Sequence, residues 1–192
     1  MRETRGNDNP MIKTIAQARQ LIKEVKVCTV FPSKKVKHTS LFENVDLPEK
    51  QAGETGWGQK VSAVWTWKTQ LPADYPDDIF YGKIKGGFAV LMDMDYMADI
   101  HFPWAYKDVR GLNSLAQYIN GRVSEEPAET GTLRRMAIEE VGCTKSQFNT
   151  ALKSLQITMN IVRLNHPDAA RDTWVPFREL YIDVWQRYVS DE

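Results

Sequence analysis

Four polar side chains between residues 145 and 153 have a spacing that would place them on one face of a helix. Lys145, Asn149 and Lys153 recur at intervals of four, and Ser146 precedes Asn149 by three. Residues three and four apart are neighbours on a helix surface. An asparagine amide can bind the edge of a base, while lysine ammonium groups and hydroxyls hold phosphate oxygens. The set is therefore typical of a surface that contacts nucleic acid.

An apolar face lies opposite these residues and predicts the helix that must position them. Phe148, Ala151, Leu152 and Leu155 follow at i, i+3, i+4 and i+7, which is the spacing of an amphipathic helix. Thr144 precedes this stripe and is followed three residues later by Gln147, a pattern that favours a capping box at the helix start.

The segments on either side of this helix predict its supports. Apolar spacing indicates a helix over residues 131–141, and Gly142 is placed to end it in the left-handed conformation. Residues 157–164 and 173–177 are predicted strands, joined by the polar loop 165–172. Two helices joined by a tight turn and followed by a hairpin form a winged helix-turn-helix.

Such a helix fits the major groove of DNA, which is about 12 Å wide, and the hairpin or wing can reach the neighbouring phosphates. A partner of double-stranded DNA is therefore expected. The predicted DNA-contacting residues are Lys145, Ser146, Asn149 and Lys153 on the helix and Arg163, His166 and Arg171 on the wing.

The N-terminal half repeats this order of elements in a weaker form. It contains a predicted helix over residues 11–27, a Trp-rich helix over residues 57–70 and a hairpin over residues 79–93. Gly86 and Gly87 lie where the hairpin turns and permit the positive φ that a two-residue turn needs. A second, degenerate winged-helix-like unit is the interpretation of this half.

The expected fold is α+β and helix-rich. Residues 1–10 are polar and predicted to be a flexible tail, with an N-terminal unit over 11–104 and a C-terminal winged helix over 105–192. The two halves are expected to pack as one compact body.

The charge balance limits the choice of partners. Basic and acidic residues are equal in number, at 25 each, which excludes a strongly basic nucleic-acid protein but not a local basic face. Between residues 144 and 171 four basic residues accompany one acidic residue. No apolar run approaches the roughly 20 residues that span a bilayer, so a cytoplasmic protein without a membrane partner is expected. Aromatic richness and zero net charge also permit protein contact or a homodimer.

The chain lacks the sequence patterns of common enzyme sites. No GxSxG, HExxH, Walker or dinucleotide-binding motif is present. Residues 93–101 contain three aspartates and a histidine, but their spacing matches no closed metal site. Cys143 precedes a predicted helix, where a small residue in a tight turn explains it better than a nucleophile does. No catalytic residue, metal or cofactor is expected.

Four features occur together in this chain: the Trp65-Thr-Trp67-Lys68 segment, the following Leu71-Pro72, the Tyr81-Gly-Lys83 hairpin and the C-terminal helix-turn-helix. In this combination the chain resembles small bacterial proteins related to the AlkZ/YcaQ-type DNA glycosylases. The resemblance covers most of the chain. It implies tandem winged helices and descent from enzymes that excise alkylated or crosslinked bases.

One departure from that family argues against the activity itself. The glycosylases carry a catalytic Gln-x-Gln or Gln-x-Asp motif, and no glutamine of this chain has Gln or Asp two residues later. The resemblance therefore implies a DNA-binding scaffold that is not catalytic. Two alternatives stay open: a winged helix used for protein contact, and a glycosylase relative that uses other carboxylates among Glu43, Asp93, Asp95 and Asp99.

Overall fold

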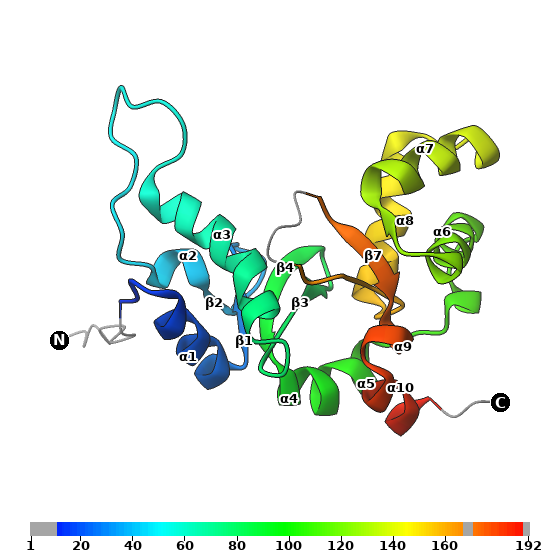
Figure 1. The fold of residues 1–192 in the computed structure, drawn as a ribbon, viewed down its shortest axis with the longest axis horizontal. Helices are drawn as coiled ribbons and strands as arrows, with labels where there is room; N and C mark the ends of the chain where they lie inside the picture. Colours follow the sequence, from blue (N-terminus) through cyan, green and yellow to red (C-terminus); the bar gives the residue numbers. More distant parts are fainter. Residues whose placement is uncertain (1–10, 167–170, 190–192) are drawn as a thin grey trace.

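The computed structural model describes residues 11–166 and 171–189, in which helices alternate with short strands (Figure 1). The predicted α+β, helix-rich class is confirmed. The predicted tail over residues 1–10 lies outside the described residues. Within the described ranges, no helix combines the length and apolar character needed to cross a membrane.

The N-terminal half forms a four-stranded sheet covered by helices. Its elements are α1 (Ile15–Val25), β1 (Val27–Thr29), β2 (Thr39–Ser40), α2 (Leu41–Asn44), α3 (Gln59–Asp74), β3 (Ile79–Ile84) and β4 (Phe88–Asp93). The strands lie in the order β2-β1-β4-β3, with β1 parallel to β2 and every other pair antiparallel. The β3–β4 hairpin turns at Gly86 and Gly87, both with positive φ, as predicted.

A short helical link leads to the C-terminal half. It comprises α4 (Met94–Tyr96), the π-helical turn η1 (Met97–His101) and α5 (Phe102–Ala105). The C-terminal elements are η2 (Val109–Gly111), α6 (Ser114–Glu125), β5 (Ala128–Glu129), α7 (Thr130–Val141), α8 (Lys145–Ile157), β6 (Ile161–Arg163), β7 (Thr173–Pro176), α9 (Phe177–Leu180) and α10 (Ile182–Tyr188). The three strands lie in the order β5-β7-β6, all antiparallel.

The two halves share one order of elements. Each has a helix, a strand, two helices and a hairpin, and in each the second hairpin strand pairs with both the early strand and the first hairpin strand. The N-terminal half adds β2 at its edge. This shared order is the one expected for two winged-helix units, and the winged-helix assignment stays an interpretation of that order.

Three clusters of buried side chains hold the chain together. One lies among α1, α2, α3 and the first sheet, and another lies among α6, α7, α8 and the second sheet. The inter-unit core joins the halves and consists of Val27, Phe80, Val90, Met92, Met97, Ala98, Phe102, Met159, Val162, Val175, Phe177 and Val184. Because its members come from both halves, the two units share buried apolar surface.

Several predicted helix limits are wrong. α3 begins after Trp57 and continues through Pro72 to Asp74. The apolar spacing from Val109 to Ile119 predicts a helix closed by Gly121, but α6 runs through Gly121 and stops at Glu125. The apolar spacing of residues 178–188 predicts one final helix, but the structure breaks it at Tyr181, whose ring packs 5.0 Å from that of Phe177 in the inter-unit core.

The capping box at the start of α8 is confirmed. Thr144 Oγ1 accepts a hydrogen bond from the Gln147 backbone N–H at 3.2 Å, and Gln147 Oε1 accepts from the Thr144 backbone N–H at 2.8 Å. Ser40 and Glu43 have the same sequence pattern, but the Ser40 side chain makes no capping bond.

Replacing Thr144 with alanine should lower the free energy of unfolding by about 1 kcal/mol, since a backbone N–H loses its acceptor. Urea denaturation of the wild type and Thr144→Ala measures the change. Ser40→Ala is the matched control, because the buried Ser40 hydroxyl has no hydrogen-bond partner among the described residues. Its stability should stay equal or rise; a larger loss for Ser40→Ala than for Thr144→Ala would contradict the assignment.

Candidate nucleic-acid interface

The exposed face of α8 carries the four predicted groove-facing residues. Lys145, Ser146, Asn149 and Lys153 are all exposed. The opposite face is buried, with Phe148, Ala151, Leu152 and Leu155 in the C-terminal core. The amphipathic pattern therefore positions the polar residues as predicted, on the outer side of the second helix of the turn.

The β3–β4 hairpin of the N-terminal unit lies against this helix, and β3 contacts both α8 and β6 (Figure 1). A Cβ added at Gly87, which has a φ of +85°, would lie 2.7 Å from Cδ of Lys153. The aliphatic part of Lys153 therefore crosses the hairpin turn where the absence of a side chain makes room for it. The polar face of α8 is thus bordered by the other unit.

Arg163 requires a correction, because it is not a solvent-exposed wing residue. Its side chain is only 5% exposed, and its guanidinium lies 4.0 Å from the ring centroid of Tyr81. Pro72 lacks the N–H that would bond to the carbonyl four residues earlier, which is that of Lys68. Arg163 Nη2 donates to this carbonyl at 3.2 Å. Arg163 therefore connects the two units rather than extending from the wing.

A group of cations gathers where the units meet, and we call Lys68, Lys83, Lys153 and Arg163 the junction cluster. Burial lowers the pKa of Lys83, and the charge of Lys153 lowers it further while Asp172 opposes the change. Burial also lowers the pKa of Lys68, and the charge of Arg163 lowers it further while the charge of Asp172 opposes the change. These directions follow because desolvation and like charges disfavour the ammonium form. The cluster is thus a local concentration of positive charge.

A cleft of about 210 Å³ opens beside this cluster, between α3 and the segments that flank the wing. Its lining consists of Trp65, Lys68, Thr69, Arg163, Leu164, His166, Arg171 and Asp172. Two of the three predicted wing residues, His166 and Arg171, are exposed and line this cleft. The other part of the predicted wing, residues 167–170, lies outside the described residues.

The arginines of the cleft have acidic partners. Arg163 Nη1 lies 3.5 Å from Asp172 Oδ1, and Arg171 Nη1 lies 3.1 Å from Glu129 Oε2. Lys68 instead lies with its ammonium 3.7 Å from the ring centroid of Trp65. No carboxylate of the described residues is paired with Lys68.

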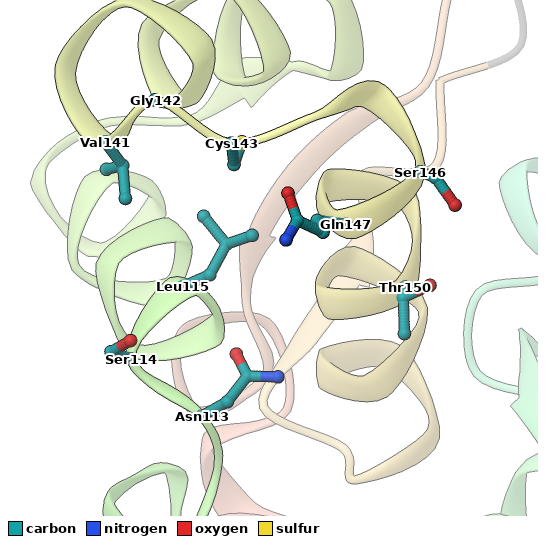
Figure 2. Close-up of a pocket in the computed structure, with 9 residues that line it drawn as sticks. All are labelled: Asn113, Ser114, Leu115, Val141, Gly142, Cys143, Ser146, Gln147 and Thr150. Atoms are coloured by element: carbon teal, nitrogen blue, oxygen red, sulfur yellow. The ribbon is translucent and has the colours of Figure 1, made fainter.

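A second hollow, of about 410 Å³, lies at the turn between α7 and α8 (Figure 2). Gln147 points into it from α8, while Ser146 points away from it (Figure 2). Cys143 lines the hollow, but neither a histidine nor an acidic or basic side chain does so. A cysteine nucleophile needs a neighbouring base or cation, so the geometry does not support catalysis by Cys143.

Comparison with known proteins places the chain in a family. A family model described as AlkZ related matches residues 12–171. The chain belongs to the AlkZ-related family. No curated protein and no solved structure matches it. The match covers the first sheet, strands β5 and β6 and the junction cluster, so it confirms the resemblance drawn from the sequence.

The four carboxylates considered for catalysis are not brought together in this AlkZ-related protein. Asp93 is only 2% exposed, accepts a hydrogen bond from the Tyr96 N–H at 3.1 Å and pairs with Lys26 at 3.3 Å. Asp99 pairs with Arg187, while Glu43 and Asp95 are exposed on separate elements. Over residues 11–166 and 171–189, no group of three His, Cys, Asp or Glu side chains could hold a metal ion.

The N-terminal unit contributes two lysines to the site that the sequence does not reveal. Lys68 and Lys83 come from α3 and β3, which were assigned to a Trp-rich helix and an ordinary hairpin. Lysines at these positions are unremarkable in the sequence, because only tertiary packing brings them beside Lys153 and Arg163. The predicted helix residues were correctly placed on one surface, but that surface is extended by the other half of the chain.

Proposed function

We propose that this AlkZ-related protein binds double-stranded DNA through the lysines of the junction cluster and the exposed face of α8. The junction cluster is the observation that carries the proposal. Cations of the cluster meet the carboxylate of Asp172, and the phosphates of DNA would provide the further negative charge that balances them. Asn149 would reach a base edge, whereas Lys145, Ser146 and Lys153 would contact phosphates.

The wing side of the cleft would add further backbone contacts. Arg171 and His166, which line this cleft, would contact a phosphate group beside the junction cluster. Arg163 would act differently from the sequence-based prediction, by holding α3 against β6 rather than by touching DNA. DNA would thus lie across both halves.

We further propose that residues 11–104 and 105–192 are two winged-helix units. The common element order and strand order support this division. Because buried residues of both units form the inter-unit core, the units would meet DNA as one body. We place the protein in the cytoplasm, where chromosomal DNA is accessible.

The proposed role is not catalytic. The resemblance implies a relation to glycosylases, but no glutamine here has Gln or Asp two residues later. The four candidate carboxylates also lie on separate elements. Binding without base excision is therefore the function that the site supports best.

Salt dependence is the direct test of this proposal. Fluorescence anisotropy with a labelled duplex of roughly 20 base pairs should show micromolar or tighter binding at about 50 mM salt. The affinity should fall by about 10²–10³-fold at about 200 mM salt, as expected for four to six phosphate contacts. Absence of binding at the lower salt concentration would contradict the proposal.

A second candidate function, protein contact or homodimerisation, is favoured by one surface feature. The Trp104 side chain on α5 is 89% exposed, and the exposed Ile100 lies four residues earlier. Large exposed apolar side chains often mark protein contacts. Sedimentation of the DNA-free protein tests this alternative, since a concentration-dependent dimer would favour it.

A further inference from the structure

Four aromatic rings of the N-terminal unit form one continuous surface, and we call Phe31, Phe42, Trp57 and Trp65 the aromatic platform. From Phe42 through Phe31 and Trp65 to Trp57, the centroids of neighbouring rings lie 5.7, 6.3 and 5.6 Å apart. Phe31, Trp57 and Trp65 are exposed, and Trp57 is exposed by 63%. Exposed apolar side chains that gather in one patch mark a binding surface, whereas single ones need no explanation.

Trp57 has the most accessible ring of the platform. It lies two residues before the start of α3, and its ring meets that of Trp65 at an interplanar angle of 70°, so the two rings are not stacked on each other. Lys68 lies over the ring of Trp65, with its Nζ 3.7 Å from the centroid. Among the described residues no cation lies over Trp57 in this way. Its ring therefore leaves room for another planar group.

The aromatic platform continues into the cleft beside the junction cluster. Trp65 belongs to both features, because it lines the cleft together with His166 and Arg171. Lys68, which lies over Trp65, is itself a member of the junction cluster. A strand that leaves the proposed DNA surface can therefore reach the exposed rings without crossing another part of the protein.

The charges beside the rings indicate the kind of partner. Lys60 lies 4.6 Å from the ring centroid of Phe42 and pairs with Glu49 at 3.2 Å. Lys68 has no carboxylate at salt-bridge distance among the described residues, although the charge of Asp172 acts on it. Rings with cations beside them suit a partner that has flat apolar groups and negative charge. Nucleic acid with unpaired bases has both, whereas an apolar protein surface has only the first.

We propose that the aromatic platform binds the unpaired bases of a single-stranded extension of DNA. Proteins hold single strands by stacking bases on aromatic rings and by attracting the phosphates with cations. An intact duplex keeps its bases stacked on one another, and taking one out costs energy. The inference rests on the proposed DNA-binding function and names its substrate: DNA in which a duplex on the junction cluster continues as a single strand on the platform.

The test compares three labelled DNAs that share one duplex of roughly 20 base pairs. The first is blunt, and the second has a single-stranded extension of about six thymidines, within the usual site size for single strands. The third has an equally long extension of tetrahydrofuran spacers, which keep the phosphates but lack bases. Both extensions are made at the 5′ and at the 3′ end. In anisotropy titrations at one salt concentration, a thymidine extension should tighten binding about tenfold, and the spacer extension should give only a small part of this gain.

Three variants make the test specific. Trp57→Ala should lose about fivefold or more of the gain from the thymidine extension, while its affinity for the blunt duplex stays that of wild type. Trp57→Phe keeps a ring and should keep most of the gain. Trp104→Ala is the matched control, because it removes an 89% exposed tryptophan from α5, outside the platform. Its gain should equal that of wild type.

The outcomes separate this inference from the DNA-binding proposal. Binding of the blunt duplex without a gain from either thymidine extension would overturn only the platform. An equal gain from the spacers, or an unchanged gain in Trp57→Ala, would overturn it as well, because charge alone would then explain the gain. Binding that requires the thymidine extension and is lost in Trp57→Ala would support the platform and overturn duplex binding. Failure to bind any of the DNAs would overturn both.

Discussion

Replacing Lys83 and Lys153 together with glutamate should weaken DNA binding by about 10²–10³-fold at about 100 mM salt. Each substitution removes a positive charge from the junction cluster and introduces a negative one. The charge of Lys153 acts on Lys83 from the other unit, so both changes alter the same surface. The slope of log affinity against log salt should also decrease by about two, because two phosphate contacts are lost.

A control with the same change in charge is available on the opposite side of the first sheet. Lys35 and Lys37 lie in the loop between β1 and β2, and β2 and β3 occupy the two opposite edges of that sheet. The Lys35→Glu, Lys37→Glu variant should retain nearly full affinity. If it loses as much affinity as the junction variant, nonspecific attraction explains the binding; if it alone loses affinity, the interface lies on that loop.

The second large effect concerns stability. Phe102→Ala should lower the free energy of unfolding by about 3–5 kcal/mol, as expected for a fully buried phenylalanine. Phe102 lies on α5 in the link, with its ring 4.6 Å from that of Phe177 and 5.3 Å from that of Tyr106. Its removal would leave a cavity in the inter-unit core. Thermal unfolding should show a fall in Tm on the order of 10 °C.

Trp104→Ala provides the internal comparison, two residues further along α5. Its side chain is 89% exposed, so its loss should change stability by no more than about 0.5 kcal/mol. Equal Tm values for wild type and Phe102→Ala would show that the units do not depend on the shared core. If Phe102→Ala loses more DNA affinity than its fraction of unfolded protein explains, the inter-unit core also holds the residues of the junction cluster in position.

These two predictions are connected through the arrangement of the units. The junction cluster contains two residues from each half, and the inter-unit core holds the halves at a fixed separation. A small displacement of β3 from α8 would separate Lys83 from Lys153. We therefore expect the proposed DNA site to be more sensitive to core substitutions than a site on one helix would be.

The sequence by itself determined the local features of this protein. Gly142 ends α7 in the left-handed conformation, and Thr144 and Gln147 cap α8, because both interactions involve residues only a few positions apart. The amphipathic stripe from Phe148 to Leu155 likewise predicted which side of α8 is buried. The α+β class and the family resemblance followed from such local patterns.

Only the tertiary structure decided features that depend on distant partners. β5 is two residues long and exists because Ala128 and Glu129 pair with β7, more than forty residues later. Arg163 is buried where it donates a hydrogen bond to the Lys68 carbonyl, 95 positions away in the chain, which Pro72 leaves without a helical N–H partner. Local sequence spacing cannot predict such a contact, because the two groups become neighbours only when the chain has folded.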